Sequence, residues 1–198
     1  SDNTYDITWK NAKAGNYTVT DNLGTLTVTK NTTAVSLTAP SDSKTYDGSA
    51  LTKSDGVTAS GLPAGFTVEA TASGSQTDAG SSDNVVNDDF VIKDGNGDDK
   101  TDNFTNVTKV KGTLTVNPKA VTITTGSDSK AYDGSALTEG TATIAGLVDG
   151  ESVTLTATGS QTEVGSSDNT YSITWNNAKK SNYTVTDNLG TLTVTKNT

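Results

Sequence analysis

One acidic stretch of the chain has the spacing of a calcium-binding loop. Asp94, Asn96 and Asp98 stand at alternate positions, and Asp102 follows them. Alternate spacing lets an EF-hand-like loop turn successive side-chain oxygens toward one Ca²⁺, which prefers oxygen ligands. The sequence therefore makes these four residues candidate ligands of a Ca²⁺ ion.

The same stretch has a plainer interpretation as a solvated hairpin turned at Asn96-Gly97 with acidic flanks. Asp99 stands where a calcium loop needs glycine, and Thr105 stands where it needs a bidentate glutamate. Asp88 and Asp89 are further acidic residues that a metal site would draw on. Both interpretations stay open at this point.

A second feature occurs twice, as Tyr46-Asp47-Gly48 and Tyr132-Asp133-Gly134. An exposed tyrosine beside a carboxylate is one common way to hold a sugar ring. The same residues also make a turn, in which aspartate caps, glycine supplies a positive φ and tyrosine plugs the end of a sandwich. Turn chemistry explains all three residue types, so it is the favoured interpretation.

A lysine stands two positions before each of these motifs, at Lys44 and Lys130. Some proteins are cross-linked by an isopeptide bond from a lysine to an Asn or Asp side chain. That reaction needs a buried lysine beside a catalytic carboxylate, and an unpaired buried lysine is costly. Lys44 and Lys130 are therefore candidate isopeptide lysines only if the fold buries them.

The composition excludes several kinds of chemistry. The chain has no cysteine and no histidine, which excludes disulfides, thiolate nucleophiles and the commonest general base. No motif singles out a catalytic carboxylate pair, so we expect no enzyme activity. The net charge of −9 argues against nucleic acid and against an anionic membrane surface as partners. No apolar run approaches the roughly 20 residues of a transmembrane helix.

The chain is built from internal repeats. Ser41–Thr52 returns almost unchanged as Ser127–Thr138, and the segment Gly-Thr-Leu-Thr-Val begins at Gly24, Gly112 and Gly190. These matches define two whole repeats, residues 34–118 and 119–198. Residues 1–32 match 167–198 at all but four positions, so residues 1–33 are expected to be the C-terminal half of a preceding repeat. The sequence is thus expected to be a fragment of a longer tandem array.

Each repeat has the pattern of short strands separated by turns. Apolar residues alternate with threonine, as in Thr4–Trp9, where Tyr5, Ile7 and Trp9 share one face. This pattern predicts an all-β fold of tandem antiparallel β-sandwiches arranged as an elongated rod. The core expected for the second repeat consists of Tyr171, Ile173, Trp175, Tyr183, Val185, Leu192 and Val194. The two tryptophans are interpreted as core residues, with sugar stacking as the alternative.

The motifs together resemble a known family. Lys-x-Tyr-Asp-Gly-x-x-Leu-Thr, Gly-Ser-Gln-Thr-x-x-Gly and Asn-Tyr-Thr-Val-Thr, followed by Gly-Thr-Leu-Thr-Val, are similar to the YDG/MBG-type immunoglobulin-like repeats of large bacterial surface proteins, notably of gut Firmicutes. The resemblance covers essentially the whole chain. It implies an extracellular, cell-wall-associated protein, and it brings no catalytic residues.

Three functions are consistent with this resemblance. The leading expectation is a non-catalytic stalk or spacer of an adhesin, which projects a distal binding domain and contacts only neighbouring repeats. The alternatives are a multivalent array that binds host or dietary glycans or mucin, and a surface filament assembled by head-to-tail self-association. No cofactor is expected, apart from the candidate Ca²⁺.

Overall fold

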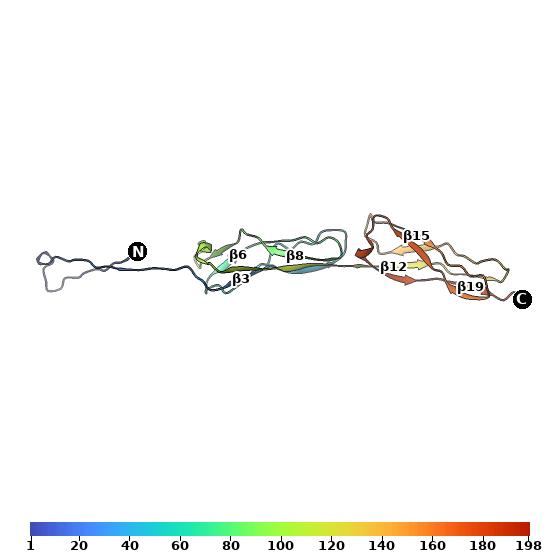
Figure 1. Cartoon of the computed structure of the whole chain (residues 1–198), viewed down its shortest axis with the longest axis horizontal. Helices are drawn as coiled ribbons and strands as arrows, with labels where there is room; N and C mark the ends of the chain where they lie inside the picture. Colours follow the sequence, from blue (N-terminus) through green and yellow to red (C-terminus); the bar gives the residue numbers. More distant parts are fainter.

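The computed structural model describes all residues, 1–198, and its fold is all-β, since the only helical segments are three single 3₁₀ turns. None of these turns is long and apolar enough to cross a membrane. An N-terminal segment (residues 1–33), a first unit (34–118) and a second unit (119–198) follow one another along the long axis in Figure 1. Most of the strand residues lie in the two units.

The first unit contains three small sheets with strand orders β10-β3-β5, β4-β11-β8-β7 and β6-β9. Its elements are β3 (Val35–Thr38), β4 (Asp42–Thr45), β5 (Thr58–Ser60), β6 (Thr67–Glu69), β7 (Ala72–Ser73), β8 (Gly80–Val86), β9 (Val91–Lys93), η2 (Thr101–Asn103), β10 (Val107–Val110) and β11 (Gly112–Asn117).

The second unit contains the corresponding sheets, with orders β14-β12-β18, β13-β19-β16 and β15-β17. Its elements are β12 (Lys119–Thr125), β13 (Asp128–Ala131), β14 (Ala142–Ala145), β15 (Val153–Ala157), β16 (Gly165–Asp168), β17 (Tyr171–Trp175), η3 (Lys180–Asn182), β18 (Tyr183–Asn188) and β19 (Thr191–Thr195). Small sheets stacked around an apolar interior are consistent with a β-sandwich.

The expectation of purely antiparallel sheets is wrong, because both units contain mixed sheets. β3 pairs with β10 and β4 with β11 in parallel, and so do β12 with β18 and β13 with β19. The reason is the course of the chain. It enters each unit at one end and leaves at the other, so the first and last strands run in the same direction (Figure 1).

In each unit, both the entering part and the leaving part of the chain pass from one sheet to another. The two parts approach each other closely where they change sheets, and this place is the crossing. At the crossing in the first unit, a Cβ added to Gly112 would lie 2.2 Å from the carbonyl oxygen of Pro40, so only glycine fits. The buried Asn84 side chain donates hydrogen bonds to the carbonyls of Pro40 and Lys53. Asn169 does the same in the second unit. Buried backbone carbonyls at a crossing need such partners because the ladder does not supply them.

The interior forms three clusters of buried side chains. One lies inside the first unit around Val35 and Leu37, and a small one in the second unit consists of Leu137, Leu192 and Val194. The third joins the two units and contains Tyr46, Leu51, Leu114, Val116, Val121, Ala178 and Tyr183. The largest buried cluster is therefore shared between two successive units.

Part of the expected core of the second unit is only half-buried. Tyr183, Leu192 and Val194 are buried, whereas Tyr171, Ile173, Trp175 and Val185 keep partial exposure. Trp175 and Val185 nevertheless pack against the buried cluster that contains Tyr183.

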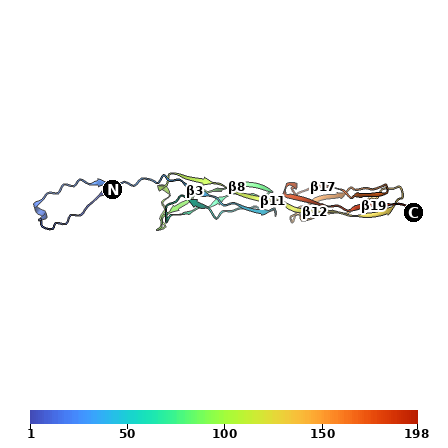
Figure 2. The ribbon, with the colours of Figure 1, turned by 90° about the horizontal axis from the view of Figure 1, so that it is seen from below.

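The N-terminal segment is an open loop that extends beyond the end of the first unit (Figure 2). Its strands β1 (Asp2–Asn3) and β2 (Gly24–Thr25) are two residues each and pair only with one another, and η1 covers Ala14–Asn16. Val28 is 98% exposed, and other apolar side chains of the segment are exposed with it, namely Tyr5, Ile7, Trp9, Tyr17, Val19, Leu23 and Leu26. Nothing in the chain covers this apolar face.

Candidate functional site: the junction between the two units

The two units are joined almost strand to strand. β11 ends at Asn117 and β12 begins at Lys119, so Pro118 is the only residue between them. Proline fixes its own φ and restricts the residue before it to extended conformations. The link is therefore short and stiff, and it brings the Tyr46 turn of the first unit against the near end of the second.

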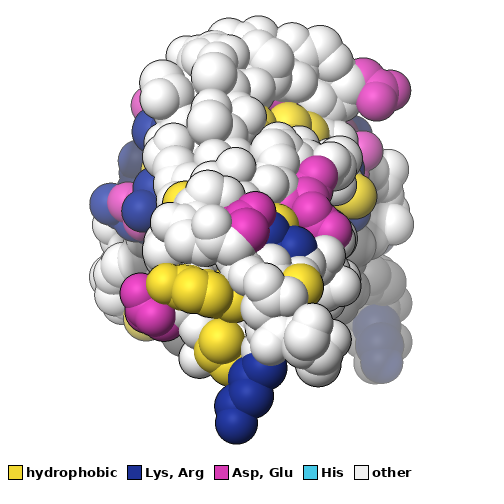
Figure 3. Space-filling model, turned by 90° about the vertical axis from the view of Figure 1, so that its right-hand side faces the viewer, with side chains coloured by type: hydrophobic (Ala, Val, Ile, Leu, Met, Phe, Trp, Pro, Cys, Tyr) yellow, Lys and Arg dark blue, Asp and Glu magenta, His cyan; other side chains and the backbone are white.

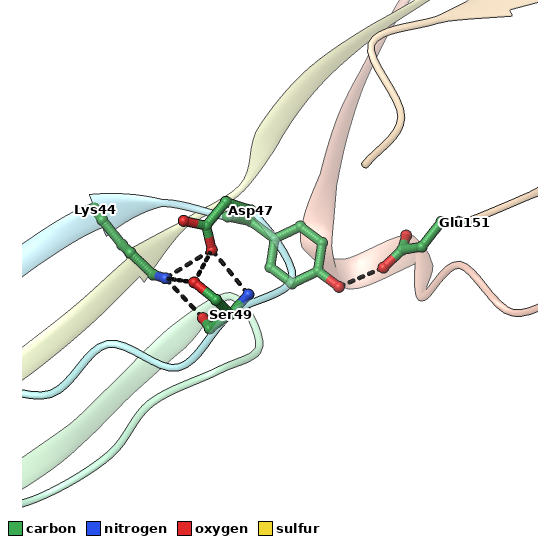
Figure 4. Close-up of polar contacts among 5 residues, drawn as sticks. Lys44, Asp47, Ser49 and Glu151 are labelled. Atoms are coloured by element: carbon green, nitrogen blue, oxygen red, sulfur yellow. Dashed lines mark hydrogen bonds and ion pairs between the residues drawn. The ribbon is translucent and has the colours of Figure 1, made fainter. Parts of the chain in front are cut away.

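The Tyr46-Asp47-Gly48 motif is a turn held by charge-assisted hydrogen bonds (Figure 4). One carboxylate oxygen of Asp47 accepts hydrogen bonds from the Lys44 ammonium at 2.6 Å and from the backbone N–H and hydroxyl of Ser49 at 2.9 and 2.8 Å. The lysine and serine bonds hold the pKa of Asp47 well below its usual range. Gly48 takes a φ of +82°, which suits glycine.

The second copy of the motif has the same internal structure. Lys130 donates to the Asp133 carboxylate at 2.8 Å and to the carbonyl of Ser135 at 2.7 Å, and Gly134 has a φ of +78°. The lysine side chains at 44 and 130 keep 21% and 22% of their surface exposed. Both lysines are ion-paired at the surface, which favours a turn-holding role, and the isopeptide hypothesis stays a prediction.

Tyr46 leaves its own turn and reaches into the next unit. Its hydroxyl donates to one oxygen of the Glu151 carboxylate at 2.5 Å, and Tyr183 donates to the other oxygen at 2.6 Å. The rings of Tyr46 and Tyr183 meet edge to face, with centroids 5.6 Å apart. The Tyr183 hydroxyl also accepts the Val148 N–H at 3.0 Å. One carboxylate thus binds a tyrosine from each unit.

These contacts raise the pKa values of both tyrosines. The hydrogen bond to Glu151 is the main cause for Tyr46, because ionisation would place a second negative charge beside the carboxylate. Burial, followed by the bond to Glu151, raises the pKa of Tyr183 to about 12. Both hydroxyls therefore stay protonated donors at neutral pH.

A second set of polar contacts crosses the junction beside the first. The Asn182 side chain is fully buried; its oxygen accepts the Ala79 N–H at 2.8 Å and its nitrogen donates to Asp78 at 2.8 Å. Lys179 donates to the other oxygen of Asp78 at 2.7 Å. The lysine contact, with that of Asn182, lowers the pKa of Asp78. The charges of Asp78 in the first unit and Lys179 in the second thereby neutralise each other.

Apolar packing completes the contact. Val121, Ala178 and Tyr183 of the second unit lie in one buried cluster with Tyr46, Leu51, Leu114 and Val116 of the first. At Gly48, an added Cβ would lie 3.1 Å from the Val148 side chain, so the turn approaches the second unit closely. Trp175 stacks on Tyr183 with ring centroids 5.6 Å apart, which buries one face of the indole.

Comparison with known proteins assigns a family to the second unit. A model of the YDG domain matches residues 117–190, a range that begins at the junction and contains Tyr132, Glu151 and Tyr183. Residues 117–190 are a YDG domain. No curated protein matches the chain, and no solved structure does.

The junction uses residues that sequence reasoning did not select. Glu151 and Asp78 carry its polar contacts, but Tyr46 lies 105 residues from Glu151 and no local pattern connects them. The tyrosine of the YDG motif was expected to plug the end of its own sandwich, and Tyr46 is indeed buried, yet what covers it belongs to the next domain. The available signal was the repetition of Gly-Ser-Gln-Thr, which Asp78 and Glu163 directly follow.

The acidic loop forms a hairpin closed by its own side chains. The Asp94 carboxylate accepts the N–H groups of Asn96 and Asp98 at 3.0 and 3.1 Å, and Lys100 lies 3.6 Å from its other oxygen. Lys100 also donates to Asp98, while Asp102 lies in η2. No three acidic side chains gather closely enough to hold a metal ion. The calcium interpretation stays a prediction, and the geometry favours the hairpin.

Proposed function

We propose that the chain is a non-catalytic spacer of a bacterial surface adhesin, extracellular and wall-associated, in which successive domains hold a distal binding domain at a distance. The observation that carries the proposal is the junction: Glu151 binds tyrosines of both units across a link of one residue. A spacer must resist bending between its domains, and a continuous buried cluster across the joint provides that resistance.

The placement of aromatic side chains supports a spacer over a glycan-binding array. An array that binds sugars along its length needs exposed aromatic rings on a common side of every repeat. Here Tyr46 and Tyr183 are buried in the junction, and Tyr132 lies beside the end of β19 through its N–H bond to the Thr195 carbonyl. The aromatic residues of the YDG motifs thus lie at the ends of the units rather than along a side.

The test is the distribution of distances between the two units. The chain has no cysteine, so cysteines introduced at the exposed Asp55 and Ser160 give a unique pair of spin labels. We expect a narrow distribution that broadens in Glu151→Ala, because both tyrosines lose their acceptor. Glu69→Ala is the matched control, since Glu69 lies away from the junction in an ion pair with Lys93. A broad distribution in the unaltered chain would exclude the spacer.

A further inference from the structure

A pocket of about 490 Å³ lies where the N-terminal segment meets the first unit. Val28 and Asn31 of the segment and Pro63, Phe66, Lys100, Asn103 and Phe104 of the unit are among the residues that line it. Phe66 and Phe104 meet edge to face, with centroids 5.7 Å apart. A pocket with aromatic rings, a lysine and an amide in its lining is complementary to an occupant that is itself aromatic and acidic.

This pocket occupies the same place in the first unit as the junction surface does in the second. η2 and η3 are each followed by an aromatic C-cap, Phe104 and Tyr183, and each turn begins after a lysine, Lys100 and Lys179. Asn103 and Asn182 stand at the same position of these turns, and each donates its N–H to the carbonyl of that lysine at 2.9 Å. Lysine, asparagine and aromatic ring thus recur in one arrangement.

In the second unit, this lysine, asparagine and aromatic ring contact residues of the first unit. Lys179 and Asn182 hold Asp78 and the N–H of Ala79, while Tyr46 packs against Tyr183. The first unit supplies all three of these partners. The corresponding residues of the second unit, which follow the same motifs, are Glu163, Val164 and Tyr132.

The second unit presents these three residues at the far end of the molecule. Tyr132 is 37% exposed and Val164 is 47% exposed, whereas Tyr46 is only 6% exposed in its contact. Figure 3 looks onto this end and shows hydrophobic side chains at the surface beside acidic ones. This end therefore carries the aromatic and acidic groups that the pocket lacks.

We propose that the pocket of the first unit binds the Tyr132 end of a second copy of this chain. Tyr132 packs against the rings of Phe66 and Phe104, and Glu163 pairs with Lys100, which gives up its present contacts with Asp94 and Asp98. The Asn103 amide binds Glu163 and the Val164 N–H, as Asn182 binds Asp78 and Ala79. Phe66 stands where the second unit has Glu151, so the tyrosine is held by apolar contact instead of a carboxylate.

The contact is heterologous, so it does not close and copies add head to tail. Because it rests on the junction geometry of the proposed function, it would extend the spacer by further copies. A contact made by a few side chains at one pocket buries little surface, and small interfaces bind weakly. We therefore expect reversible association that depends on protein concentration.

Sedimentation equilibrium of the full chain over a concentration series tests the proposal. The variants used each reverse one charge at the contact. Glu163→Lys and Lys100→Glu should each weaken self-association about tenfold or more, since each places like charges at the contact. An equimolar mixture of the two variants should associate again, because opposite charges then meet. Glu69→Lys and Lys111→Glu carry the same charge changes away from the contact and should behave like the unaltered chain.

A second variant set separates this contact from association through the N-terminal segment. Tyr132→Ala should abolish association, and Ile7→Ser with Leu26→Ser, on the exposed apolar face, should leave it in place. A chain that is monomeric at every concentration overturns the inference, and so does association that only the Ile7 and Leu26 changes remove. A monomer that still gives a narrow distance distribution between its units would overturn this inference alone and leave the spacer proposal standing.

Discussion

Residues 1–32 and 167–198 are nearly the same sequence in two different structures. In the second unit, Leu192 and Val194 are fully or almost fully buried and Tyr183 is 7% exposed. The corresponding Leu26, Val28 and Tyr17 of the N-terminal segment are 54%, 98% and 59% exposed. Four differences among 32 positions do not explain this contrast, because none of these six residues is among them.

The two regions share only the contacts that form within the segment itself. Tyr5 donates to Asp21 and Tyr171 to Asp187, both at 2.6 Å, and Trp9 stacks on Tyr17 as Trp175 stacks on Tyr183. In the second unit, residues 167–198 pack against the front half of their repeat, residues 119–166. That half supplies β12 and β13, which pair with β18 and β19, and the carbonyls of Gly126 and Glu139 to which the buried Asn169 donates. Strand formation here is a property of the complete repeat.

The largest expected effect compares the two equivalent leucines. Leu192→Ala should lower the free energy of unfolding of the second unit by about 2–5 kcal/mol, because it leaves a cavity in a three-residue cluster. Leu26→Ala should change it by less than about 0.5 kcal/mol, since Leu26 already contacts solvent. Denaturant unfolding followed by tryptophan fluorescence measures both. Equal effects would mean that the N-terminal segment is packed in solution.

A smaller effect compares the two equivalent glycines. A Cβ at Gly190 would lie 2.1 Å from the carbonyl oxygen of Gly126, whereas at Gly24 the nearest atom is Asn3 Cβ at 3.9 Å. Gly190→Ala should therefore cost about 1–3 kcal/mol by forcing the crossing strands apart. Gly24→Ala should leave the unfolding midpoint unchanged. A harmless Gly190→Ala would show that the crossing is looser than the structure describes.

The smallest expected effect is a pH dependence of the folding stability. It arises from the Tyr183 hydroxyl and should be absent in Tyr183→Phe. The folded state raises the pKa of Tyr183 from its ordinary 10.0 to about 12, so the unfolded chain loses that proton first. The stabilisation is complete below pH 10 and is lost as the pH rises toward 12. Thermal unfolding of both proteins between pH 8 and 12 should show their difference shrink. A constant difference would mean that Tyr183 acts only through packing.

The sequence was sufficient for the class of fold, because alternation of threonine with apolar residues and regular turns specify short strands. It was not sufficient for sheet direction, since parallel pairing of β12 with β18 joins residues about 60 positions apart and no local pattern encodes it. Trp175 and Ile173 alternate like core residues, but alternation predicts only which face they share, and both stay half-buried.

The junction shows a different limit of sequence reasoning. The YDG turn could be predicted because the hydrogen bonds that Asp47 accepts span two and three residues. Its partner could not, because Glu151 has phenylalanine at the corresponding place in the other unit, so the repeat does not mark it. A contact between repeats is specified by positions where the repeats differ as well as by those they share.

The parallel pairing of the first two strands of the second unit with its last two has a consequence for tension. β12 and β18 lie side by side over six paired residues and point the same way, and the chain continues from their opposite ends. A pull on the two ends of the unit therefore drags these strands past one another along their length. All the hydrogen bonds between them are loaded at once, instead of opening one after another as in a peeled hairpin. The unit thus yields by shear, the mode in which a ladder of hydrogen bonds shares the load.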